Sequence, residues 1–74
     1  MYIVNVNKLK GRMVELGLSM SDVAAKMGIN QTTLYRKFAN DGAGLSISDA
    51  QQLVEILQLT AEEAIAIFFT KVVA

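Results

Sequence analysis

The chain has no cysteine, no histidine and no proline among its 74 residues. Without cysteine no disulfide can close a loop, and without cysteine or histidine the usual structural zinc sites are excluded. The same absence removes the side chains that most often form a nucleophile–base pair, and the acidic residues stand where helix caps are expected. We therefore expect neither an enzyme nor a protein that needs a metal or a cofactor.

Long apolar runs are also absent. The longest, residues 64–69, falls far short of the ~18 apolar residues that a membrane-spanning helix needs. The first five residues lack the basic region and the cleavage site of a signal peptide. We expect a single cytoplasmic domain over residues 1–74, in which 53% hydrophobic residues suffice for a core.

The chain has no excess of charge of either sign, because seven basic residues balance seven acidic ones. The two signs are nevertheless distributed unevenly. Residues 1–40 hold six basic and two acidic groups, a net charge of +4, whereas residues 41–74 hold one basic and five acidic groups, a net charge of −4. This division is compatible with a basic face and an acidic back, or with charge that is merely scattered and solvated.

Glycine and small polar residues divide the chain into five helical segments. The first is expected to begin at a cap formed by Asn7, to bury Leu9, Met13 and Leu16, and to end at Gly17.

The next two helices carry clear boundary signals. Ser19 with Asp22 is a cap followed by an acidic third residue, and Gly28 ends this helix because the turn needs a positive φ. Asn30 can cap a third helix, and residues 40–44 are a loop by composition. The residues expected to face inward are Val23, Ala24, Met27, Ile29, Leu34 and Phe38.

Two further helices complete an all-α domain. Ser46 with Asp49 begins the fourth, and Thr60 to Glu63 form a capping box for the fifth. Five short helices with short connections indicate a compact helical domain. The inward stripe of the fourth helix is expected to be Ile47, Ala50, Leu53, Val54 and Leu57.

The two ends of the chain differ from its middle. Residues 2–6 and 68–73 are rich in β-branched and aromatic side chains. They could pair as a two-stranded antiparallel ribbon, within one chain or across a dimer. An apolar helix that continues to the C-terminus is the alternative.

Residues 20–38 are the most informative stretch. Two helices joined by a short turn cross steeply, which limits the size of residues at the crossing. Ala24 is small where the helices approach, Gly28 stands at the turn, and Ile29 and Leu34 fill the angle. This spacing favours a helix-turn-helix motif at about residues 20–39 over a generic helical hairpin.

Residues 23–34, Val-Ala-Ala-Lys-Met-Gly-Ile-Asn-Gln-Thr-Thr-Leu, resemble the phage Cro and C1 repressor-like helix-turn-helix family, and the similarity extends over nearly the whole chain. The segments 8–12, 33–38 and 67–72 are similar to those of small phage proteins of Gram-positive hosts. The resemblance implies a five-helix lambda-repressor-like fold that binds operator DNA as a Cro-like transcriptional regulator without a cofactor.

The resemblance also assigns residues to the DNA interface. The second helix of the motif would lie in the major groove, where Gln31 suits adenine and Thr32 a base edge or a thymine methyl. The chain departs from the family at Met20, where glutamine commonly contacts the DNA backbone and braces the recognition helix, which methionine cannot do. Arg36 could donate to a guanine edge or to a phosphate. The implied groove residues are Asn30, Gln31, Thr32, Thr33, Tyr35 and Arg36, and the implied phosphate contacts are Ser21, Lys37 and Asn40.

Simpler interpretations stand beside these. The polar residues could be an ordinary first helical turn, Arg36 and Lys37 a solvated face, and Tyr35 half-buried packing. A protein-interaction module, such as an antirepressor or antitoxin, is the alternative function, which an apolar exposed face on helix 30–39 would favour. A homodimer is expected, at least on DNA, unless the apolar C-terminal residues close the core of the monomer. Its expected interface is formed by Phe68, Phe69, Val72 and Val73.

Overall fold

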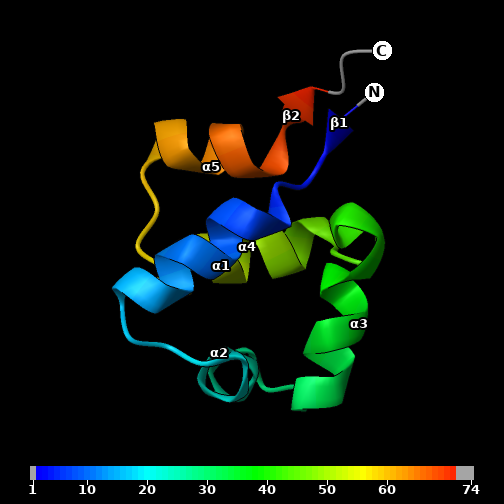
Figure 1. Ribbon diagram of the computed structural model, residues 1–74, viewed down its shortest axis with the longest axis vertical. Coiled ribbons are helices and arrows are strands. Elements are labelled where there is room, and N and C mark those ends of the chain that lie inside the picture. Colours follow the sequence, from blue (N-terminus) through cyan, green and yellow to red (C-terminus); the bar gives the residue numbers. More distant parts are fainter. Residues whose placement is uncertain (1, 72–74) are drawn as a thin grey trace.

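Five helices account for most of the structure, a computed structural model that describes residues 2–71. The predicted five-helix all-α architecture is confirmed (Figure 1). No helix among the described residues is long and apolar enough to cross a membrane. In chain order the elements are β1 Tyr2–Ile3, α1 Val6–Glu15, α2 Met20–Met27, α3 Gln31–Gly42, α4 Ile47–Ile56, α5 Ala61–Phe68 and β2 Thr70–Lys71.

The helices begin at the side-chain caps that the sequence supplies. Complete capping boxes start α2, α4 and α5, with Ser19, Ser46 and Thr60 as the capping residues. The prediction for α1 is wrong by two residues. Its cap is Asn5, whose Oδ1 accepts the backbone N–H of Lys8 over 3.1 Å, and Asn7 lies inside the first turn. The helix starts earlier because half-buried Val6 packs against the core.

The end of α3 is irregular where the sequence predicts a loop. Residues 39–41 leave helical geometry, and Asn40 and Asp41 have φ angles of 53° and 57°. Asn and Asp tolerate this left-handed region better than most residues. Buried Gly42 follows with a φ of 76°, and a Cβ atom there would lie 2.7 Å from the Cβ of Val4. The N-terminal segment is therefore packed closely against the end of α3.

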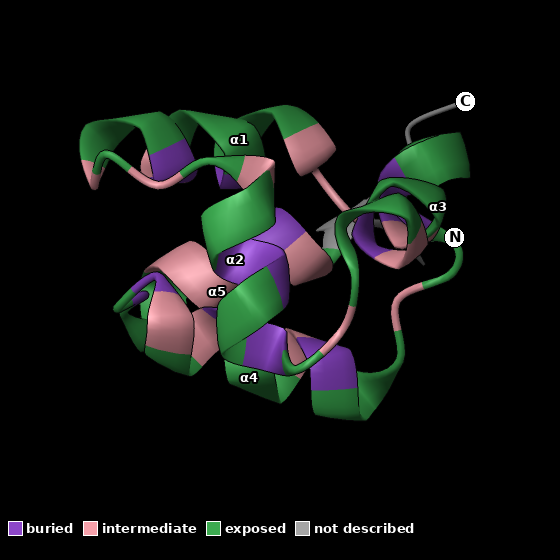
Figure 2. Cartoon of the chain, turned by 90° about the horizontal axis from the view of Figure 1, so that it is seen from below, coloured by how far each residue is buried: buried purple, intermediate pink, exposed green. Residues whose placement is uncertain are grey.

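The core lies where the helices meet (Figure 2). Helix α2 packs on α3 and α4, while α1 packs on α3 and α5. The prediction that Ile47 faces inward is wrong, since this residue is 84% exposed. Ile47 is the first residue of α4 and lies at the edge of its inward stripe, so no neighbouring element covers it. The buried apolar residues are Leu9, Met13, Val23, Ala24, Met27, Leu34, Phe38, Leu53, Leu57, Leu59 and Ile67.

The two ends of the chain pair with one another. Strand β1 runs antiparallel to β2, with Tyr2 opposite Lys71 and Ile3 opposite Thr70. The predicted ribbon thus forms within one chain and is two residues long on each side. Helix α5 ends at Phe68 and β2 follows it, so the alternative of an apolar helix that continues to the C-terminus is wrong. Val72 and Val73 lie outside the described residues.

Candidate nucleic-acid interface

The turn between α2 and α3 depends on one glycine. Gly28 has φ 74° and ψ 26°, and a Cβ atom there would meet nothing within 4 Å. Its constraint is therefore backbone conformation rather than space, as the sequence predicts. Figure 1 shows the result, because α2 is seen end-on while α3 runs along the length of the molecule. The two helices cross steeply.

Helix α3 is fixed at its start and along its inner side. The backbone N–H of Thr33 donates to Oδ1 of Asn30 over 2.8 Å, so Asn30 is the predicted cap. Leu34 and Phe38 are buried, and Ile29 packs against the core from the turn. Two of the predicted groove residues thus have a role in the fold itself. Asn30 caps the helix, and Thr33 is half-buried.

The outer side of α3 carries four exposed residues, Gln31, Thr32, Tyr35 and Arg36. Positions four apart lie on the same side of a helix, so Gln31 lies beside Tyr35 and Thr32 beside Arg36. Within the described residues, none of these side chains forms a hydrogen bond or an ion pair with the protein. Their polar groups are available to a ligand along two turns of one helix.

The three residues expected to contact phosphates have different environments in the structure. Ser21 is exposed in the first turn of α2, and Asn40 is exposed at the left-handed kink. Lys37 differs from them, because its Nζ lies 2.8 Å from Oδ2 of buried Asp49. The charge of Lys37 is therefore neutralised inside the protein, which does not support the role expected for it at a phosphate.

Comparison with known proteins identifies the family. A family model described as helix-turn-helix matches residues 9–63, a range that includes the turn at Gly28 and the whole of α3. The chain belongs to the helix-turn-helix family. Membership makes it a DNA-binding protein of a transcription-regulating, typically non-enzymatic class, with double-stranded DNA as the implied partner. No curated protein and no solved structure gives a significant match.

The basic residues of this helix-turn-helix protein are not all available to DNA. The Nε–H group of Arg12 donates to the carbonyl of Leu57 over 3.0 Å, and its Nη1 lies 3.3 Å from Glu15. Arg12 therefore caps the C-terminal end of α4, where backbone carbonyls lack helical hydrogen-bond partners. With Lys37 paired as well, four exposed basic groups in the first 40 residues form no ion pair within the described part of the chain, and these are Lys8, Lys10, Lys26 and Arg36.

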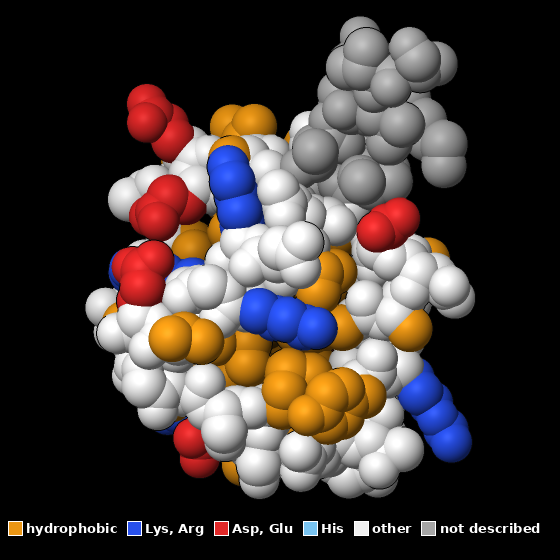
Figure 3. Space-filling view, in the orientation of Figure 1, with side chains coloured by type: hydrophobic (Ala, Val, Ile, Leu, Met, Phe, Trp, Pro, Cys, Tyr) orange, Lys and Arg blue, Asp and Glu red, His pale blue; other side chains and the backbone are white. Residues whose placement is uncertain are grey.

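The basic side chains on the face seen in Figure 3 do not gather in one place. Figure 3 shows Lys and Arg side chains well apart on the visible face, with several acidic side chains at its left edge. Of the two alternatives left by the sequence, the visible face corresponds to scattered charge. An interface on α3 would then depend on a few charges at defined positions rather than on a broad basic surface.

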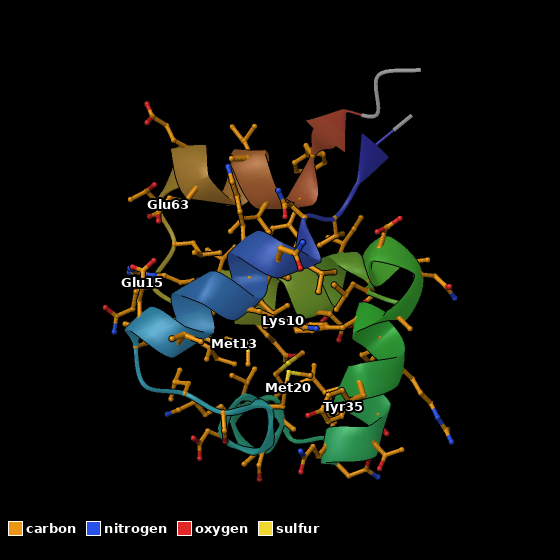
Figure 4. All side chains as sticks on the ribbon, viewed as in Figure 1. Lys10, Met13, Glu15, Met20, Tyr35 and Glu63 are labelled. Carbon is orange, nitrogen blue, oxygen red and sulfur yellow. The ribbon has the colours of Figure 1, made fainter. Side chains whose placement is uncertain are left out.

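Sequence reasoning missed one group of side chains beside α3. Figure 4 shows Met20 and Tyr35 next to each other between α2 and α3, with Lys10 of α1 just above them. Tyr35 is 52% exposed and Met20 is partly buried. The exposed flank of α3 thus combines a polar part with an apolar part. The family resemblance implies that position 20 lies beside the recognition helix, but nothing in the sequence brings Tyr35 and Lys10 to it, because the three residues belong to three helices.

Proposed function

We propose that this helix-turn-helix protein binds double-stranded DNA in a sequence-specific manner through α3, as a small Cro- or repressor-like regulator of a phage or prophage. The main support is the position of Gln31, Thr32 and Arg36, which are exposed, adjacent on the first two turns of α3 and without a side-chain partner among residues 2–71. The phage assignment rests on the similarity of segments 8–12, 33–38 and 67–72 to small phage proteins.

The chemistry of this surface suits base edges in the major groove. A glutamine amide can donate to and accept from adenine at once, an arginine can donate twice to guanine, and a threonine can offer a hydroxyl or a methyl. The exposed hydroxyl of Ser21 at the start of α2 suits a phosphate oxygen, as does the amide of Asn40. Lys37 has no part in this proposal because Asp49 holds its charge.

Selection of bound sequences from a random duplex pool tests the proposal. The wild-type protein should enrich a common motif, and Gln31→Ala should enrich a motif with one position relaxed in each half-site. Gln52→Ala is a suitable control, because it is the same change at an exposed residue of α4, outside the helix-turn-helix motif. Failure of the wild type to enrich any motif would reject the proposal and favour the protein-interaction module.

We further propose that two copies bind together. One recognition helix covers few base pairs, and symmetric dimers on near-palindromes are the usual solution. The supporting observation is an apolar groove between α4 and α5, beside which Ile47 and Phe69 are 84% and 61% exposed. Half-buried Val54 and Phe68 line the same groove. This groove includes the two described residues of the expected C-terminal interface.

Sedimentation equilibrium decides between this interface and a monomer. The wild type should associate at micromolar concentration, and Phe69→Ser should weaken the association. Val14→Ser is the matched control, because Val14 is 78% exposed on α1 and does not line the groove. A wild type that stays monomeric at high micromolar concentration both alone and on its selected operator would contradict the dimer.

A further inference from the structure

The flank of α3 that faces the start of α2 is apolar. Tyr35 lies one helical turn after Gln31, so its ring continues the line of the outer side chains. It is 52% exposed, and its hydroxyl has no hydrogen-bond partner within the described residues. Met20, the first residue of α2, packs partly on the core and lies beside this ring (Figure 4).

One basic group borders this apolar surface. Lys10 of α1 is exposed, forms no ion pair in the described part of the chain, and lies just above Met20 and Tyr35 (Figure 4). In Figure 3 the same region shows apolar side chains around a single Lys or Arg. A ligand that fits must therefore offer an apolar group close to a negative charge.

We propose that Met20 and Tyr35 form a contact for the C5-methyl group of a thymine, next to a phosphate bound by Lys10. This inference rests on the proposed function, because it requires α3 to lie in the major groove. There, thymine presents the one apolar group among the edges of the four bases. The contact adds thymine specificity at a position next to the base read by Gln31.

The expected effect is small but measurable. Removing a methyl from an apolar contact costs about 0.8 kcal/mol, which corresponds to about a fourfold loss of affinity. Replacing a thymine by uracil removes this methyl and leaves every hydrogen-bonding group of the base unchanged. The substitution therefore isolates the apolar contact from the hydrogen bonds made by Gln31 and Arg36.

The experiment uses the full chain and its selected operator, with each thymine replaced by uracil in turn. Wild-type affinity should fall about fourfold at one thymine of each half-site. Met20→Gln and Tyr35→Gln should bind the thymine and uracil operators equally at that site. Met20→Leu and Tyr35→Phe are the matched controls, which keep the apolar surface and should keep the penalty. Thermal melts identify any variant that does not fold.

Three results would overturn the proposal. The first is a wild type that binds all uracil operators as tightly as the original. The second is a uracil penalty that persists in both folded glutamine variants. The third is a penalty removed by Thr32→Ser, which would assign the methyl to Thr32 instead. In all three the protein still binds its operator, so the proposed function survives. A wild type that binds no duplex at low salt would reject both together.

Discussion

The ammonium of Lys37 lies 2.8 Å from Oδ2 of Asp49, and this ion pair joins α3 to the first turn of α4. The same carboxylate oxygen accepts the backbone N–H of Ser46 over 2.9 Å. One carboxylate therefore caps α4 and holds the helix that carries the candidate interface. The pair orients α3 from its inner side and leaves Gln31, Thr32 and Arg36 exposed.

Lys37→Met should destabilise the fold without touching the outer side of α3. The substitution leaves the mostly buried carboxylate of Asp49 without its charged partner, at a cost of about 1–3 kcal/mol in the free energy of unfolding. Urea denaturation of the variant measures this cost. Lys26→Met is the control, since an exposed substitution should change stability by less than about 0.5 kcal/mol. Equal stability of the two variants would show that the ion pair contributes nothing.

Acid should destabilise the protein partly through Asp49. Burial by itself would raise the pKa of Asp49, but hydrogen bonds from Lys37 and Ser46 outweigh burial and lower this pKa below its ordinary value. A lowered pKa in the folded state gives stability that is complete above the ordinary carboxylate pKa and is lost as the pH falls through the lowered one. We expect the free energy of unfolding of the wild type to decline below about pH 5.

Asp49→Asn is the test of that assignment, because the amide oxygen can still accept from Ser46 but does not titrate. Its stability should be lower at neutral pH and should decline less steeply in acid. The remaining decline would come from Asp22 and Glu63, whose pKa values are lowered by hydrogen bonds from the backbone and side chains of Ser19 and Thr60. A variant whose pH profile runs parallel to that of the wild type would contradict the role of Asp49.

Gly42→Ala should be more harmful than the same change at another left-handed glycine. Its φ is 76°, and the new Cβ would lie 2.7 Å from the Cβ of Val4. Left-handed strain and the clash together should cost at least about 2 kcal/mol. Gly17→Ala is the control, because its φ is 70° and no atom lies within 4 Å, so only about 1 kcal/mol of strain is expected. Adding Val4→Gly, which removes the clashing Cβ, should recover part of the loss at Gly42 but none at Gly17.

Local features of the fold could be predicted from the sequence. Ser19, Ser46 and Thr60 precede acidic residues by three positions, and this pattern fixes where three helices begin. Gly28 predicts the turn because few other residues adopt a positive φ. The start of α1 was misplaced because Asn5 and Asn7 are both good caps, and the packing of Val6 decides between them.

Contacts between distant residues could not be predicted. The sequence shows Asp49 as a cap for its own helix, but not that Lys37 reaches it from twelve residues away. Arg12 is one of the six basic groups in residues 1–40, but the sequence does not show that it donates to the carbonyl of Leu57. The outer side of α3 could be predicted in detail because helical spacing from Leu34 determines it, whereas the apolar surface formed with Met20 required the packing of α2.

The salt dependence of DNA binding should separate Lys10 from Lys37. Each phosphate contact of a basic group contributes ~0.9 to the slope of log affinity against log salt concentration. Lys10→Gln should reduce this slope by about that amount, because Lys10 is the proposed phosphate contact and forms no ion pair among the described residues. Lys37→Met should leave the slope unchanged, as its charge is already neutralised by Asp49. A reduced slope for Lys37→Met would mean that Lys37 leaves Asp49 to bind phosphate.

The central claim is that the outer side of α3 determines which DNA sequence is bound, while its inner side only maintains the fold. The most direct test is a base-by-base affinity scan of the operator with Gln31→Ala and with Leu34→Ala. Thermal melts of both variants accompany the scans. Gln31→Ala should melt like the wild type and lose about 1–3 kcal/mol of discrimination at one position per half-site. Leu34→Ala removes a fully buried side chain and should lose about 2–5 kcal/mol of stability, with unchanged preference in whatever fraction stays folded. If Gln31→Ala and Arg36→Ala both kept wild-type affinity and wild-type preference, α3 would not be the helix that reads DNA.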